Sequence, residues 1–140
     1  MPVGDPYAIG AGSATGPVTP AQRADLQRVV QKARDISGFV FAVYLGPLAE
    51  GRATAIERHA SLPDAASAVL VAVDPTARSI EIVTGTNAAI PISERSCELA
   101  VLAMTSCFAN NDLVGGLREG VTLLAMHARH PRTYNLDEPA

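Results

Sequence analysis

The sequence predicts an α/β (α+β) fold, in which a mixed β-sheet with one β-hairpin is sandwiched by about four helices. Residues 69–73 form an unbroken apolar run, which is typical of a strand buried on both faces of a sheet. After a turn at residues 74–78, residues 80–82 alternate between apolar and charged side chains, as in a strand with one wet face. Two helices are predicted before this hairpin, with one more strand between them, and two helices after it, so helices are expected on both faces of the sheet.

The composition indicates one folded domain. The chain has 140 residues, and 48% of them are hydrophobic, which is enough to bury a core in a domain of common size. We assign residues 1–17 to a flexible N-terminal arm, residues 18–130 to a single domain and residues 131–140 to a loose C-terminal tail. Within the arm, residues 7–10 suit a short edge strand.

Charge and hydropathy exclude two classes of partner. The net charge of −3 argues against nucleic acid, which usually meets a basic surface. The apolar run from Phe39 to Leu45 is far shorter than the ~20 residues of a membrane helix, so no membrane insertion is expected. Residues 1–5 lack the basic start and apolar core of a secretory signal, and we therefore expect a cytoplasmic protein.

The first helix has clear start and stop signals. Thr19 is its predicted cap, Pro20 occupies its first turn, and Gln22 completes a capping box. Ser37-Gly38 ends it. Its buried face is expected to comprise Leu26, Val29, Val30 and Ala33.

The middle of the chain predicts one strand, then a short helix and then a hairpin. Residues 39–45 are apolar on both faces and predict a central strand, and residues 49–61 predict a helix that ends before Pro63. In the hairpin loop, Asp74 and Pro75 hold the first two positions of a type I turn.

Two further helices complete the domain. Ser93 caps the third helix, residues 110–112 end it and Asp112 caps the fourth, which Pro131 is expected to end. Apolar residues at helical spacing predict the buried stripes, which are Cys97, Ala100, Val101, Met104 and Phe108 in the third helix and Leu113, Leu117, Val121, Leu124 and Ala128 in the fourth. Three glycines, Gly115, Gly116 and Gly120, predict close approach of a neighbouring helix.

The cysteines and histidines favour structural roles. Cys97 and Cys107 are separated by about 15 Å along one helix, too far for a disulfide, and are expected to be buried free thiols. His127 and His130 suit the negative end of the fourth helix better than a metal site, because no third ligand is near in sequence. His59 is expected to be partly exposed on the surface.

From residue 18 to residue 128 the chain resembles the TPM domain, and more closely a small bacterial family of unknown function related to it. The resemblance rests on five segments in the expected order, which are Val18-Thr-Pro, Gly38-Phe-Val-Phe-Ala-Val-Tyr-Leu-Gly-Pro-Leu48, the hairpin from Val69 to Gly85, Met104-Thr-Ser-Cys-Phe108 and Asp112-Leu-Val-Gly-Gly-Leu-Arg-Glu-Gly120. It implies a mixed-sheet sandwich, with acid phosphatase activity or divalent-cation binding in some relatives. The glycine-rich, aspartate-containing loop of TPM domains is replaced here by residues 85–94, which hold one glycine and no aspartate.

Oxygen-bearing residues near helix starts are the candidates for chemistry. Glu94 and Asp112 are the candidate metal ligands, because Ca²⁺ and Mg²⁺ prefer oxygen. The candidate ligand-binding residues are Gly85, Thr86, Asn87, Asn110 and Asn111. If these loops converge, they form one site. Each also has an ordinary explanation as a cap or a favourable charge at a helix start.

Two functional hypotheses remain. The sequence contains no complete set of catalytic residues that would identify an enzyme. The preferred hypothesis is a non-catalytic binding or accessory module without a cofactor, with a protein partner possible. The alternative is a divalent-metal-dependent phosphatase, in which Glu94 and Asp112 hold Ca²⁺ or Mg²⁺. Homo-oligomerisation through the glycine-lined fourth helix is compatible with either.

Overall fold

The computed structural model describes residues 8–9 and 18–137, with side chains described from residue 18 to residue 129. The predicted fold class is confirmed. In chain order the elements are β1 (Ala8–Ile9), α1 (Pro20–Ser37), β2 (Val40–Leu45), α2 (Arg52–Ala60), the 3-10 turn η1 (Ala65–Ser67), β3 (Ala68–Asp74), β4 (Ser79–Thr84), α3 (Glu94–Ala109) and α4 (Leu113–Asp137). Most of the predicted arm and the last three residues lie outside the described part.

The four strands form one mixed sheet in the order β1-β2-β3-β4. β2 and β3 run parallel, while β1 and β4 pair antiparallel at the two edges. The edge strand expected at residues 7–10 is present as the two-residue β1. β3 is buried along its whole length, which confirms the strand predicted from the apolar run.

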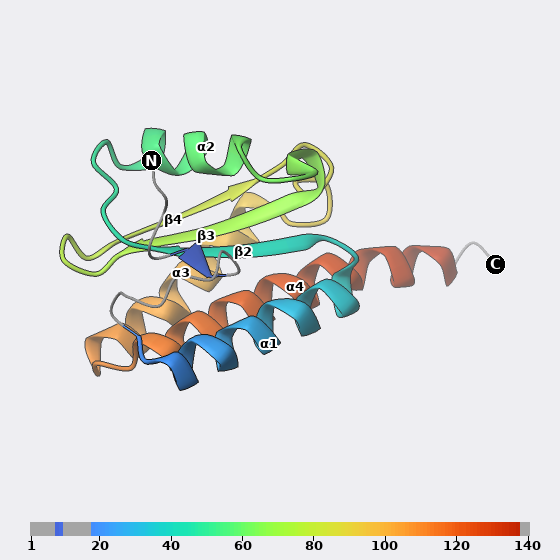
Figure 1. Cartoon of the computed structure of the whole chain (residues 1–140). Helices are drawn as coiled ribbons and strands as arrows, with labels where there is room; N and C mark the ends of the chain where they lie inside the picture. Colours follow the sequence, from blue (N-terminus) through green and yellow to red (C-terminus); the bar gives the residue numbers. More distant parts are fainter. Residues whose placement is uncertain (1–7, 10–17, 138–140) are drawn as a thin grey trace.

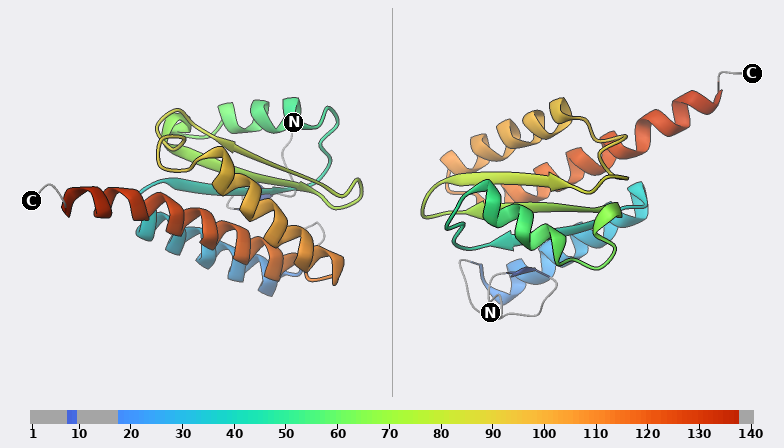
Figure 2. Two further views of the ribbon diagram at one scale, coloured as in Figure 1. Left: turned by 180° about the vertical axis from the view of Figure 1, so that it is seen from behind. Right: turned by 90° about the horizontal axis from the view of Figure 1, so that it is seen from above.

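Helices cover the two faces of the sheet unequally. Figure 1 shows α1, α3 and α4 on one face and α2 on the other, and Figure 2 shows the same layers from behind and from above. Paired residues of β2 and β3, such as Val43 and Val71, bury their side chains against the three-helix layer. Their neighbours Tyr44 and Leu70 belong to a smaller apolar cluster that includes Ala55 of α2.

Local sequence signals place both ends of α1 and the start of α3 where they were predicted. The Thr19 and Gln22 side chains form both hydrogen bonds of the capping box at the start of α1. Gly38 ends α1 with φ of 84°, a left-handed conformation that glycine adopts at little cost. The Ser93 hydroxyl accepts a hydrogen bond from the Ser96 amide at the start of α3.

The glycines of α4 allow α3 to approach closely. A Cβ atom built at Gly116 would lie 2.4 Å from the ring of Phe108, and one at Gly120 would lie 2.6 Å from Sδ of Met104. Gly115 differs, because a Cβ there would meet the carboxylate of Asp112. Gly116 and Gly120 therefore face α3 of the same chain, as their predicted role in close helix approach requires, and homo-oligomerisation through α4 stays a prediction.

Two histidine interpretations and one helix boundary need correction. α4 continues through Pro131 to Asp137, because a proline removes one hydrogen bond and can leave a long helix helical on both sides. His127 therefore lies inside α4 and not at its end, and the side chain of His130 lies outside the described part. His59 is 8% exposed and thus buried, because its side of α2 packs on the sheet, where Nε2 lies 2.9 Å from the carbonyl oxygen of Ala68.

None of the helices in the described part of the chain is both long enough and apolar enough to cross a bilayer.

Candidate functional site

The candidate metal ligands and ligand-binding residues lie at the two opposite ends of α3. Glu94 begins this helix, and Asn87 lies in the loop that leads to it. Asn110, Asn111 and Asp112 follow its last residue. A helix rises 1.5 Å per residue, so α3 separates the two groups by about 22 Å. The condition for a single site, that these loops converge, is therefore not met, and Glu94 and Asp112 cannot bind the same ion.

Several of these residues have partners within the chain. The Asn87 side-chain amide donates to Oγ of Ser67 at 3.0 Å. Gly85 approaches the chain itself, since a Cβ there would lie 2.0 Å from the carbonyl oxygen of Ala65. Asp112 Oδ1 accepts a hydrogen bond from the Gly115 amide at 2.9 Å and so caps α4. Thr86 is exposed in the same loop as Gly85.

Among the described residues, no three His, Cys, Asp or Glu side chains come together as a metal-ligand set. Glu94 and Asp112 are both exposed, each in a different part of the surface. Their role as metal ligands stays a prediction.

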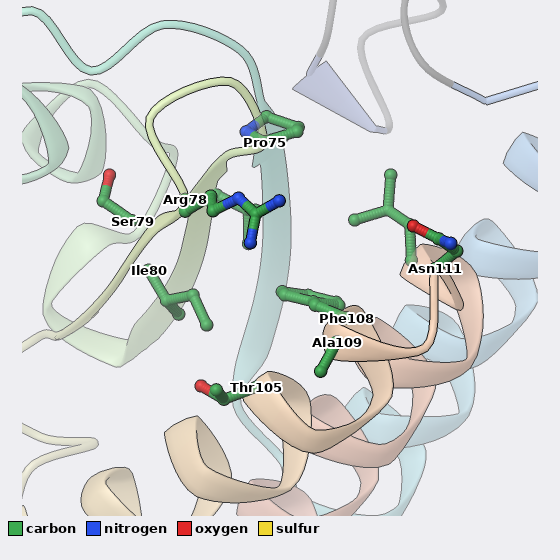
Figure 3. Close-up of a pocket in the computed structure, with 10 residues that line it drawn as sticks. Pro75, Arg78, Ser79, Ile80, Thr105, Phe108, Ala109 and Asn111 are labelled. Atoms are coloured by element: carbon green, nitrogen blue, oxygen red, sulfur yellow. The ribbon is translucent and has the colours of Figure 1, made fainter.

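The structure instead forms a pocket where the β3–β4 hairpin meets the turn between α3 and α4. The pocket has a volume of about 330 Å³, which is at the small end of the range for ligand sites. Figure 3 shows the side chains that line it. The lining residues are Val73, Pro75, Arg78, Ser79, Ile80, Thr105, Phe108, Ala109, Asn111 and Leu113. One of them, Asn111, belongs to the predicted set of ligand-binding residues.

The walls are mostly apolar and carry one charged group. Ile80, Phe108 and Leu113 are partly buried and pack against the main core, which fixes their positions. Arg78 is exposed, and it forms no ion pair with any described residue. Thr105 adds a hydroxyl on α3, but its Oγ1 already donates to the carbonyl oxygen of Val101 at 2.8 Å.

Two lining residues hold left-handed backbone conformations. Arg78 has φ of 58° and Asn111 has φ of 62°. Asparagine tolerates this region well, whereas a side chain such as arginine is held there at a cost of roughly 1 kcal/mol. The last position of a hairpin loop that needs this conformation usually carries glycine. Of these two residues, Arg78 is therefore the one whose presence the local backbone conformation does not explain.

Asp74 positions the loop that carries Pro75 and Arg78. One carboxylate oxygen accepts a hydrogen bond from the Leu48 amide at 3.0 Å, and the other accepts one from the Ala77 amide at 3.1 Å. The Leu48 hydrogen bond, followed by that of Ala77, lowers the pKa of Asp74 below its ordinary value of 3.8. The turn role predicted for Asp74 is confirmed, and the contact with Leu48 is an additional one that the sequence does not indicate.

A serine and a histidine also meet, between α3 and α4. Nδ1 of His127 lies 2.7 Å from Oγ of Ser96, which in turn lies 3.1 Å from Oγ of Ser93. Ser96 is buried, and no described carboxylate orients the imidazole. We interpret this contact as a link between the two helices rather than as a catalytic pair.

The two cysteines are free and half-buried. Burial is the main reason that the pKa of the Cys97 thiol is raised above its ordinary value of 9.0. The thiolate is the reactive form, so Cys97 is a poor nucleophile at neutral pH.

Known proteins resemble the chain in both sequence and fold. Residues 5–125 match a family described as "Domain of unknown function (DUF5130)". The uncharacterized proteins Rv2468c and MT2543 of Mycobacterium tuberculosis are each 38% identical over 88 residues, which is 61% of this chain and 52% of the relative. The chain thus spans about half the length of the curated relatives that it matches.

A solved structure shares the fold. The N-terminal domain of the cg2496 protein from Corynebacterium glutamicum, determined by solution NMR, matches with a TM-score of 0.63 and 13% sequence identity. The match covers 81% of this chain and 76% of the other. At this identity the similarity concerns the fold alone.

Proposed function

Because the chain belongs to the DUF5130 family, whose function is unknown, we propose from its geometry that it is a non-catalytic binding module. The proposed binding site is the pocket between the β3–β4 hairpin and the α3–α4 turn. The observation that carries this proposal is a small concave site with fixed apolar walls and a few polar groups at its rim, which is the usual composition of a ligand site.

The lining residues favour binding over catalysis. Ser79 and Thr105 supply hydroxyl groups, but none of the ten described lining residues is a histidine, an aspartate or a glutamate that could activate them. In addition, the Thr105 hydroxyl already donates a hydrogen bond to a backbone carbonyl of α3. Reversible occupation of the pocket is therefore the function that these side chains support best.

The proposal is tested with 4-phenyl-1-butanol, a neutral probe that fits apolar walls. We expect saturable shifts of the methyl signals of Ile80 and Leu113 in NMR spectra of the whole chain. Ala109→Phe, at the last residue of α3, fills the pocket and should abolish these shifts. The matched control is Ala60→Phe, at the last residue of α2 on the opposite face of the sheet. Shifts that are absent, or that survive in Ala109→Phe, would count against the pocket.

A relationship to the TPM domain, and with it a divalent-metal-dependent phosphatase, is the second candidate. It is supported by the five TPM-like segments in the sequence and by the exposed oxygen ligands of Glu94 and Asp112. Titration with Ca²⁺, Mg²⁺ and Mn²⁺ should then shift amide signals at these two residues separately, because α3 holds them apart. An unchanged spectrum at millimolar ion would leave the binding module as the better proposal.

The proposal also includes a cytoplasmic location and a possible protein partner. The free thiols Cys97 and Cys107 suit a reducing compartment. Fractionation of the source cells tests the location.

A further inference from the structure

We propose that Arg78 makes the hairpin pocket selective for a small apolar carboxylic acid. This inference rests on the proposed function, because it names the chemical class of ligand that the same pocket binds. The carboxylate would bind the guanidinium of Arg78 at the rim, and the apolar part of the acid would lie against the side chains of Ile80, Phe108 and Leu113.

The charge of the lining supports an anionic ligand. Arg78 is the single ionisable side chain among the ten described residues of the pocket. The carboxylates that adjoin the lining residues in sequence already have partners. Asp74 accepts hydrogen bonds from the amides of Leu48 and Ala77, and Asp112 accepts one from the amide of Gly115. Glu81 forms an ion pair with Arg52 at 3.1 Å. The guanidinium therefore has no anionic partner within the described chain, and a ligand carboxylate would supply one.

The charged group and the apolar side chains of the pocket face the same space. Figure 3 shows the Arg78 side chain extending from the hairpin towards the space between Pro75 and Phe108, with Asn111 on the far side. The Ser79 hydroxyl points away from this group. An amphipathic acid can thus reach the guanidinium with one end while its other end covers the Phe108 ring. The Asn111 amide could donate a second hydrogen bond.

The size of the pocket limits the ligand. A volume of about 330 Å³ suits a small organic acid rather than a large cofactor. The pocket is open at its rim and its cation is exposed, so the ion pair is partly screened by water. Most of the affinity would come from the apolar walls, and the selectivity for an acid would come from Arg78.

The test compares three probes that share a phenyl ring and a four-carbon chain and end in an anionic, a neutral or a cationic group. These are 4-phenylbutyrate, 4-phenyl-1-butanol and 4-phenylbutylamine, each titrated into the whole chain with NMR detection of the pocket methyl groups. We expect the acid to bind about tenfold more tightly than the alcohol, and the amine to bind most weakly. Raising the salt concentration should reduce the preference for the acid and leave the affinity for the alcohol nearly constant.

Variants of Arg78 assign the preference to this residue. Arg78→Gln should equalise the acid and the alcohol, whereas Arg78→Lys should retain part of the preference. Arg78→Gly is a second neutral variant that keeps the left-handed turn conformation, in case glutamine disturbs the loop. The matched control is Arg95→Gln, an exposed arginine near the other end of α3, which should leave all three affinities unchanged.

The outcomes separate this inference from the proposed function. If the alcohol and the acid bind equally well to the native chain, or if Arg78→Gln and Arg78→Gly keep the preference for the acid, the acid selectivity is wrong while the pocket stands. If none of the three probes binds, both the pocket and its selectivity are overturned.

Discussion

Replacing Asp74 by alanine should destabilise the fold by about 1.5–3.5 kcal/mol. Leu48 is 7% exposed, so its amide would lose its hydrogen-bond acceptor in a site that water does not reach easily, at a cost of about 1–3 kcal/mol. Ala77 is exposed, and its amide can bind water instead, at a cost of about 0.5 kcal/mol. For a domain of this size the sum corresponds to a fall in Tm of about 8 °C.

The pH dependence of stability identifies the carboxylate as the cause. The folded-state pKa of Asp74 lies below 3.8, so the carboxylate stabilises the folded state fully at pH values above the unfolded-state pKa. This contribution is lost as the pH falls through the folded-state pKa. Asp74→Asn removes the charge but keeps the shape, and the difference between it and the native chain should therefore shrink between neutral pH and about pH 3.

Urea unfolding followed by circular dichroism at several pH values measures both effects. Asp35→Ala is the control, because Asp35 is exposed on α1 and contacts a glutamine of the same helix, so its loss should change stability by less than about 0.5 kcal/mol. The reasoning is refuted if Asp74→Ala is as stable as the control, or if the difference between Asp74→Asn and the native chain does not change with pH.

Three further substitutions test the packing and the pocket. His59→Ala should destabilise by about 2 kcal/mol in urea unfolding, because it leaves a cavity under α2 and removes the contact with Ala68. Gly116→Ala should cost about 1–2 kcal/mol despite the better helix propensity of alanine, and it should shift the NMR signals of Phe108, whose ring the new Cβ would strike. Arg78→Gly should leave the chain as stable or up to about 1 kcal/mol more stable in thermal unfolding, since glycine suits the left-handed position. Stabilities unchanged in the first two variants, or a clear loss in the third, would contradict these accounts.

The features that depend on neighbouring residues could be predicted from the sequence. The capping box of Thr19 and Gln22 needs only a few residues of local backbone, and the burial of residues 69–73 follows from an apolar run too continuous for an exposed strand. The burial of His59 could not be predicted in this way. It depends on how α2 lies on the sheet, and an imidazole suits both exposed and buried positions.

The sequence itself contains the reason why the candidate residues do not form a single site. Glu94 and Asp112 flank a helix that was already expected, and a helix of that length keeps its ends about 22 Å apart. The pocket was missed because its walls come from two segments, residues 73–80 and 105–113, that the sheet and the α3–α4 pair bring together. The available signal was Arg78 at the end of a hairpin loop, where a glycine would be the ordinary choice.

That signal also connects the stability of the loop to its proposed role. Asp74 fixes the start of the loop through two backbone hydrogen bonds, and the left-handed residue at its end directs the guanidinium of Arg78 towards the pocket. A loop built for stability alone would combine the same aspartate with glycine. Departures from the locally preferred residue are concentrated at functional sites, where the loss in stability is offset by binding. A firmly anchored loop that ends in a strained cation, with no ion-pair partner among the described residues, is therefore better explained by a ligand than by the needs of the fold.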